Sequence, residues 1–213
     1  MAALLACAAA CPGVAWADSP VRCESKLAGV SPRLVETDPR ARLSWIDTRL
    51  SASARTARQW TWGWGGGIAA SGVASLAVVP FVAPGDRIDW YTSAGSAAIG
   101  LIPFLTSPFD VTTDAPALHR ALDVRSLEIP AAEVCGLLDT AEASLARDAA
   151  NQQTQRSLWF HVANMAFNLG VTLFLGLGFH HWAGGAINGI AGAAVGEAII
   201  FTQPSATIED LSA

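Results

Sequence analysis

Acidic and basic residues are absent from four stretches of the chain, and the three longest of these are strongly apolar. They cover 59–85, 90–109 and 157–196. A hydrocarbon core about 30 Å thick is crossed by about 20 apolar residues of helix. The pattern therefore predicts an all-α membrane protein, because the helices of a soluble core rarely run so far without a charge. The alternative is a soluble all-α protein with one buried core.

Four transmembrane helices fit these three stretches, near 60–82, 90–109, 158–179 and 183–201. The last two are separated around 180–185, where two His, a Trp and two Gly indicate a turn at a membrane surface. The spans then pair into two transmembrane hairpins, 60–109 and 157–203. Six of the eight tryptophans lie at predicted span ends, where an indole places its N–H in the headgroup zone.

The amino-acid composition is consistent with a membrane protein and excludes one class of function. Of the 213 residues, 15% are charged and 52% are hydrophobic, whereas an ordinary soluble domain has about 25% charged residues. The net charge is −5, and no block of the sequence is rich in Lys or Arg. These features argue against a nucleic-acid binder.

The first 17 residues resemble a secretory signal. They are apolar and end in Ala15-Trp16-Ala17, which fits an A-x-A cleavage site, although no basic residue precedes the apolar run. A lipid-attachment box ending at Cys7 is the alternative. Cleavage of 1–17 makes 18–59 and 110–156 extracytoplasmic, the first with an amphipathic helix and the second helical, and leaves 204–213 as a short tail.

The orientation that follows from this signal conflicts with the distribution of basic residues. It places 12 of the 13 Lys and Arg outside the cytoplasm, whereas the positive-inside rule favours the reverse. The number and positions of the cysteines favour the arrangement in which the N-terminus lies outside the cytoplasm. Once the signal leaves, Cys23 and Cys135 remain, one in each outer segment, which suits a disulfide in an oxidising compartment. Two unrelated buried thiols are the alternative. The predicted location is the cytoplasmic membrane of a bacterial-type cell.

The two outer segments are built alike. In the first, Asp38-Pro39 favours a helix start, and apolar residues follow at spacings of three and four from Leu43 to Ala57. In the second, Pro130 opens a helix with the same spacing from Val134 to Ala149. Each helix leads towards a span, so the chain could be a parallel pseudo-repeat. Two amphipathic helices entering a membrane would also look like this.

Polar residues inside the third and fourth spans are the candidate functional site. His161, Asn164 and Asn168 share one helical face, and Glu197 is expected at about the depth of Asn164. Three interpretations compete: interhelical hydrogen bonds that fix packing, a proton or small-ligand site, and a metal site that adds His119. No metal-binding spacing supports the third, and the sequence predicts no metal and no cofactor.

A stripe of glycines follows the fourth span. Its members, spaced four, three and four residues apart, are Gly185, Gly189, Gly192 and Gly196. Such a stripe lets a second helix backbone approach closely. The partner could be another span of the same chain or another subunit.

Catalytic motifs are absent from the sequence, which contains neither G-x-S-x-G nor a phosphate-binding loop in a suitable context. We therefore expect a structural or interaction component of the cell envelope, with the lipid bilayer, an envelope protein or a second copy of the chain as partners. The alternative is a small transport, proton or redox component that uses His161 and Glu197.

Overall fold

The computed structural model describes residues 22–25, 36–123 and 129–212. The predicted signal segment, 1–17, lies outside them. Every element within these ranges is a helix, so the prediction of an all-α protein is confirmed. By length and composition, four helical stretches are long and apolar enough to cross a membrane. They indicate an integral membrane protein.

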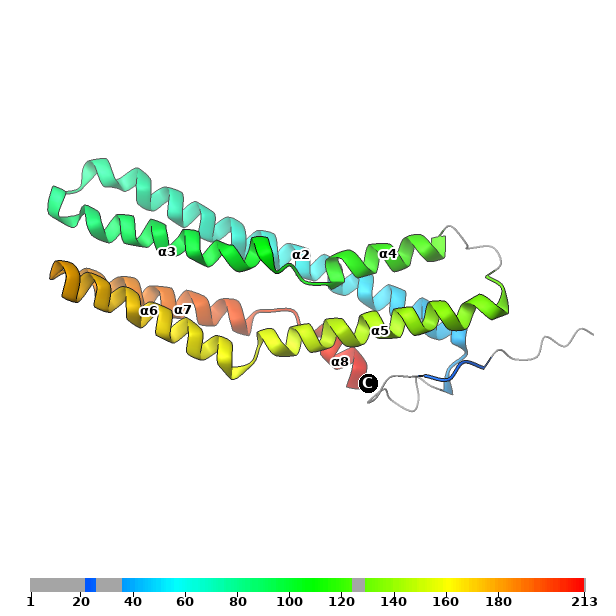
Figure 1. Ribbon diagram of the computed structural model, residues 1–213. Coiled ribbons are helices and arrows are strands. Elements are labelled where there is room, and N and C mark those ends of the chain that lie inside the picture. The colour runs from blue at the N-terminus through cyan, green and yellow to red at the C-terminus, as the bar shows by residue number, and fades with distance from the viewer. Residues whose placement is uncertain (1–21, 26–35, 124–128, 213) are drawn as a thin grey trace, which may run out of the picture.

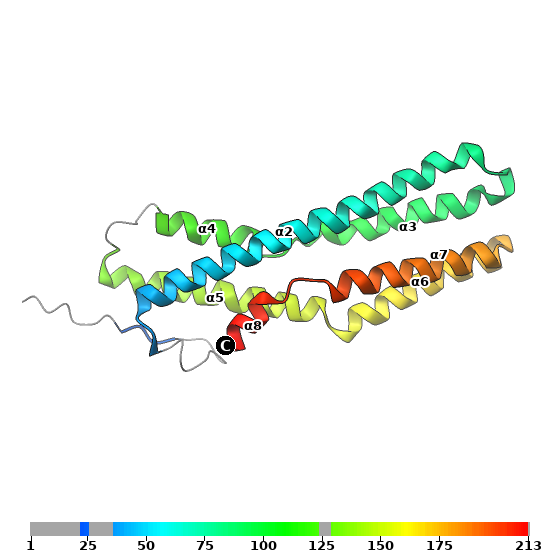
Figure 2. The ribbon, with the colours of Figure 1, turned by 180° about the vertical axis from the view of Figure 1, so that it is seen from behind.

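The helices form an elongated molecule (Figures 1 and 2). In chain order they are α2 (Pro39–Val78), the short 3-10 turns η1 (Val79–Phe81) and η2 (Pro84–Asp86), α3 (Arg87–Thr106), α4 (Val111–Asp123), α5 (Ala131–Gln155), α6 (Leu158–Phe179), α7 (Trp182–Phe201) and α8 (Ala206–Ser212). At one end of the molecule α2 lies beside α3, and α6 beside α7. The first half of α2 packs with α4, α5 and α8 at the other end, which we call the outer bundle.

Helix α2 is one unbroken helix of 40 residues that belongs to both ends. It begins where the Asp38 carboxylate accepts hydrogen bonds from the backbone N–H groups of Arg40 and Ala41, at 3.0 and 3.1 Å, and where Pro39 occupies the first turn. It ends at Val78, two residues before Pro80. The second outer helix differs, because α5 and α6 are separated at Arg156 and Ser157.

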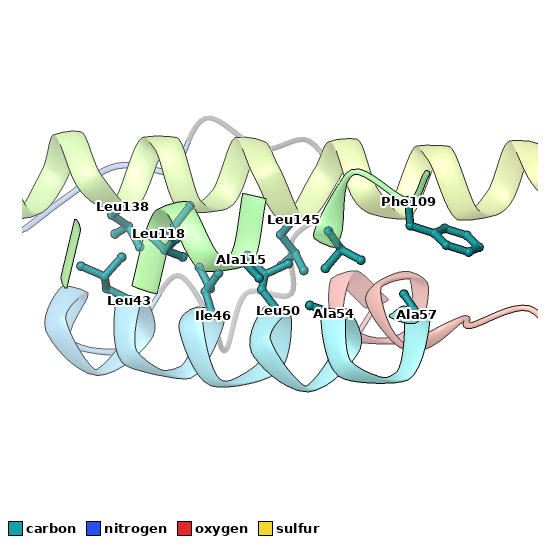
Figure 3. Close-up of a cluster of buried hydrophobic side chains, with 12 residues drawn as sticks. Leu43, Ile46, Leu50, Ala54, Ala57, Phe109, Ala115, Leu118, Leu138 and Leu145 are labelled. Carbon is teal, nitrogen blue, oxygen red and sulfur yellow. The ribbon is translucent and has the colours of Figure 1, made fainter. Parts of the chain in front are cut away.

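The outer bundle is held by a conventional apolar core (Figure 3). Helix α2 contributes side chains at spacings of three and four, from Leu43 to Ala57, and α5 contributes Leu138, Ala141 and Leu145. All of these are nearly inaccessible to solvent. The amphipathic seams that the sequence predicts on these two helices therefore face each other, with α4 packed alongside.

The bounds of one helix of the outer bundle, and the existence of another, are not predicted by the sequence. Helix α4 buries Val111, Ala115 and Leu118, a short seam that Pro116 obscures. Helix α8 lies where the sequence predicts only a short tail. It packs against α5 and α2, and its Asp210 carboxylate pairs with Arg49 of α2. Residues 206–212 are thus part of the outer bundle.

The paired helices at the other end of the molecule have an apolar surface. Large apolar side chains are exposed along α3, α6 and α7, including Leu105 at 79% and Ile190 at 71%. In water this surface would favour association or aggregation, but in a bilayer it faces acyl chains. The exposed apolar surface begins at the boundary between the outer bundle and the paired apolar helices.

Candidate functional site

His161 and Glu197 are brought together across the α6–α7 interface. Nδ1 of His161 lies 2.5 Å from Oε2 of Glu197. The other carboxylate oxygen of Glu197, Oε1, accepts a hydrogen bond of 2.9 Å from the side-chain amide of Asn164. The His161 and Glu197 side chains are 24% and 19% exposed, so the pair lies at the margin of the interface. The His161 ring also contacts Phe201, with ring centroids 5.2 Å apart.

The polar contacts continue along α6 as a ladder. The amide of Asn168 donates to the side-chain and backbone oxygens of Asn164, each at 2.9 Å. One turn further, the hydroxyl of Thr172 lies 3.0 Å from the backbone oxygen of Gly185 and 3.1 Å from that of Asn168. Asn164 also donates to the backbone oxygen of Ala193 at 3.1 Å. The polar groups on this face of α6 therefore bond to each other and to α7.

The glycine stripe of α7 packs directly against these polar residues of α6. A side chain at Gly196 would collide with Oδ1 of Asn164, one at Gly192 with Oδ1 of Asn168, and one at Gly189 with the hydroxyl of Thr172. At Gly185 an added Cβ would lie 2.7 Å from the backbone oxygen of Thr172. The polar residues and the glycines, two separate features of the sequence, thus form the two halves of one helix–helix interface.

This interface has one chemical capability beyond packing. A proton can pass between an imidazole nitrogen and a carboxylate oxygen that are within hydrogen-bond distance. In the ionised state, Glu197 accepts from Nδ1–H of His161 and from the amide of Asn164, which fixes the position of the carboxylate. Asn168, which the sequence places on the same face, lies one step away from the carboxylate and contacts Asn164.

Polar contacts between α3 and α7 were not anticipated from the sequence. Nδ1 of His181 lies 3.1 Å from Oδ1 of Asp89, and the Ser93 hydroxyl bonds to the side-chain oxygen of Asn188. The available signal was Asn188, a polar residue within a long uncharged stretch. These contacts join the α2–α3 pair to the α6–α7 pair at the end furthest from the outer bundle, which we call the tip.

His119 is not part of the polar ladder. It lies on α4 in the outer bundle, where its Nδ1 is 3.0 Å from Oδ2 of Asp47. Asp47 therefore raises the pKa of His119 through a hydrogen bond and its charge. Across the ranges that the structure describes, no three His, Cys, Asp or Glu side chains gather in a way that could hold a metal ion.

The predicted disulfide between Cys23 and Cys135 is confirmed. Their Cα atoms are 5.3 Å apart, and the bond ties the segment 22–25 to the start of α5. Beside it, the Ser25 hydroxyl donates to Glu142 at 2.8 Å, and Glu142 forms an ion pair of 2.9 Å with Arg42. Both charged side chains are almost fully buried, so this corner of the outer bundle combines a covalent bond with a buried charge pair.

Comparison with known proteins finds no matching family model, no matching curated protein and no matching solved structure.

Proposed function

We propose that this protein is a structural or interaction component of a bacterial-type cell envelope, integral to the cytoplasmic membrane through two transmembrane hairpins. One observation carries the proposal. The polar side chains of the α6–α7 interface are seated on glycines and bonded to each other and to the facing helix. Their hydrogen-bonding capacity is used to hold two helices together, which is the role of a packing interface.

The outer bundle is the part that would meet a partner. Because α2 runs unbroken from the outer core into the apolar end, the bundle is held at a fixed position relative to the bilayer. We propose that the chain uses one plan twice, an outer amphipathic helix followed by a transmembrane hairpin. Helices α2 and α5 pack against each other and would be the matching elements of the two copies.

The proposed orientation places the outer bundle outside the cytoplasm. The Cys23–Cys135 disulfide supports it, because disulfides persist in oxidising compartments. An impermeant maleimide applied to intact cells tests it. We expect labelling of both cysteines from outside only after reduction. Labelling that requires a permeabilised membrane and no reductant would place the outer bundle in the cytoplasm.

Photo-crosslinking in living cells tests the interaction role. A photoreactive amino acid is placed at Ala143 or Ala150, which are exposed on α5, and at Ile187, exposed on α7, as the membrane-facing control. We expect a discrete protein adduct from the α5 positions, and we expect it to persist when His161 is replaced by Ala. Adducts equally frequent at Ile187, or none at α5, would contradict the proposal.

A second candidate function is a proton or redox component that uses His161 and Glu197. The 2.5 Å separation of Nδ1 and Oε2 favours it, as does the partial exposure of both side chains. Replacing each residue separately by Ala distinguishes the two functions. If the variants stay folded and a proton-linked activity disappears, the structural proposal fails.

A further inference from the structure

A groove of about 530 Å³ runs between α3 and α6, on a different face of α6 from the polar ladder. Its walls are apolar and aromatic, with Phe167 and Phe174 from α6 and Ile88, Tyr91 and Ile99 from α3. The volume is in the range of small-molecule sites. Because α3 and α6 belong to different helix pairs, the groove lies where the two proposed hairpins meet.

Two glycines leave the groove open. Gly95 of α3 and Gly170 of α6 both line it, and a Cβ added at either position would meet no atom within 4 Å beyond its own stretch of helix. These glycines differ from those of the α7 stripe, whose missing side chains make room for α6. The space at Gly95 and Gly170 is not filled by this chain.

The length of the groove matches one leaflet of a bilayer. On α3 its lining extends from Ile88 to Ile99, about 16 Å of helix at 1.5 Å per residue. Half of a hydrocarbon core is about 15 Å. The groove begins beside the tip and ends near the middle of the proposed membrane-spanning region, as one extended acyl chain would.

A basic residue, Arg87, comes one position before Ile88, the first residue of α3 that lines the groove. Arg87 is the first residue of α3 and lies four and eight residues before Tyr91 and Gly95, so it shares their helical face. Its Nε is enclosed and has no hydrogen-bond partner among the described residues. It is also the one Lys or Arg between Arg58 and Arg120 in the sequence. A guanidinium in this position suits a phosphate, to which it can donate two parallel hydrogen bonds.

The other charges of the tip indicate which headgroup fits. Asp86 precedes Arg87 and is exposed, and Asp89 is paired with His181. The formal charges of Asp86, Arg87 and Asp89 sum to −1, so a headgroup with a second negative charge would be repelled. A zwitterionic headgroup places its phosphate on Arg87 and leaves an ammonium group for the acidic side.

We propose that the α3–α6 groove binds a zwitterionic phospholipid of the phosphatidylethanolamine type, with its phosphate on Arg87 and one acyl chain along Gly95 and Gly170. The site rests on the membrane-spanning arrangement proposed above. The lipid would fill space between the two hairpins. Their polar contacts lie at the tip and, at the other end, where Trp60 and Trp64 donate to Thr202.

Photo-crosslinking with lipid tests this site in the full-length chain. The protein is reconstituted in vesicles that contain phosphatidylethanolamine with a diazirine in the acyl chain, and the adducts are mapped by peptide digestion. We expect adducts within 88–99 and 166–174. Native mass spectrometry then measures how much lipid the protein retains in detergent. Phosphatidylethanolamine should be retained at least about tenfold more than diacylglycerol, which lacks the phosphate that Arg87 would bind.

Matched variants separate the acyl chain from the headgroup. Gly170→Leu fills the groove and should abolish the adducts, whereas Gly67→Leu, at another open glycine outside the groove, should leave them unchanged. Arg87→Gln should lower retention of phosphatidylethanolamine about tenfold, and Arg120→Gln on α4 should not.

Each other outcome contradicts the proposal. Equal adducts in the Gly170→Leu and Gly67→Leu variants would show that the lipid contacts are non-specific. Stronger retention of phosphatidylglycerol would exclude the zwitterionic headgroup. Conversion of a dimer to a monomer by Gly170→Leu would make a second copy the occupant. Extraction of membranes with alkaline carbonate is the separate control. Release of the unaltered protein would show that it does not span the membrane. If the protein stays in the membrane, a negative result in the lipid experiments contradicts the lipid site alone.

Discussion

Asn164 of α6 and Gly196 of α7 are complementary: the side-chain oxygen of Asn164 occupies the space that a side chain at position 196 would need. The amide nitrogen of the same residue donates to the neighbouring carboxylate of Glu197 at 2.9 Å. One asparagine therefore contacts the glycine stripe and the polar ladder at once. The close approach of the helices and the hydrogen bonds between them depend on each other.

Replacing Gly196 with Ala should weaken the α6–α7 pair. The new methyl group would displace the Asn164 side chain and disturb its bond to Glu197, and overpacking of this kind costs about 1–3 kcal/mol. Thermal unfolding in detergent, followed by circular dichroism, measures the loss. Gly178→Ala is the matched control, because an added Cβ there meets nothing within 4 Å. Equal stability of the two variants would refute this account of the interface.

A double-mutant cycle sharpens the same prediction. Asn164→Ala removes the side chain that collides at position 196, so adding it to Gly196→Ala should relieve the overlap. The two substitutions should then be non-additive by about 0.5–3 kcal/mol. Simple additivity would mean that Asn164 and Gly196 act independently.

Asp148 should make the outer bundle less stable as the pH rises. Burial, together with the like charges of Asp110 and Asp114, raises the pKa of Asp148 to about 7 from an ordinary value of 3.8. Among the residues that the structure describes, neither oxygen of its carboxylate has a hydrogen-bond partner. The folded state therefore holds this proton more tightly than the unfolded state, so stability should fall between about pH 4 and pH 7 and level off above that range.

Replacing Asp148 with Asn removes this titration while keeping the shape of the side chain. We expect the variant to be more stable than the unaltered protein at pH 8, by on the order of 1–3 kcal/mol, and the difference to vanish near pH 4. Denaturant unfolding across this pH range measures it. A variant that is less stable at pH 8 would mean that the ionised carboxylate stabilises the bundle.

The buried ion pair between Arg42 and Glu142 should be costly to break. The two groups are 2.9 Å apart with side chains 1% and 2% exposed. Glu142→Ala removes the buried carboxylate that pairs with Arg42, and breaking a buried ion pair from one side typically costs about 3–5 kcal/mol. Arg42→Met combined with Glu142→Leu should lose much less, because both charges leave together. Thermal unfolding compares the variants.

A solvent-exposed pair in the same bundle provides the control. The His119 side chain is 62% exposed beside Asp47, and His119→Ala should change stability by less than about 1 kcal/mol. If Glu142→Ala costs no more than His119→Ala, the buried pair contributes nothing particular to the fold.

The sequence predicts the features that depend on composition and local spacing. Long uncharged stretches predict the four apolar helices, and an even number of cysteines outside the predicted signal predicts the Cys23–Cys135 bond. The spacing of three and four on α2 and α5 predicts the seam of the outer bundle. The helices and the seams can each be identified within one segment of the chain, and the disulfide follows from a count of cysteines.

What the sequence could not predict depends on how helices are rotated about their axes. The contact of Asn164 with Gly196, and that of Asp89 with His181, each require the register of one helix against another, which no single segment contains. Helix α8 is a different case. It is seven residues long, and isolated helices of that length are unstable in water, so its formation depends on packing against α2 and α5.

The most direct test of the structural role is a proton-flux measurement on the protein in sealed vesicles containing a pH-sensitive dye. The unaltered protein is compared with His161→Ala and Glu197→Ala, and the unfolding of all three is measured in parallel. We predict that both variants lose stability and that proton flux across the vesicle membrane equals that of empty vesicles in every case. A flux that is carried by the unaltered protein and disappears in folded His161→Ala and Glu197→Ala variants would contradict the structural role and make this pair a proton-transfer site.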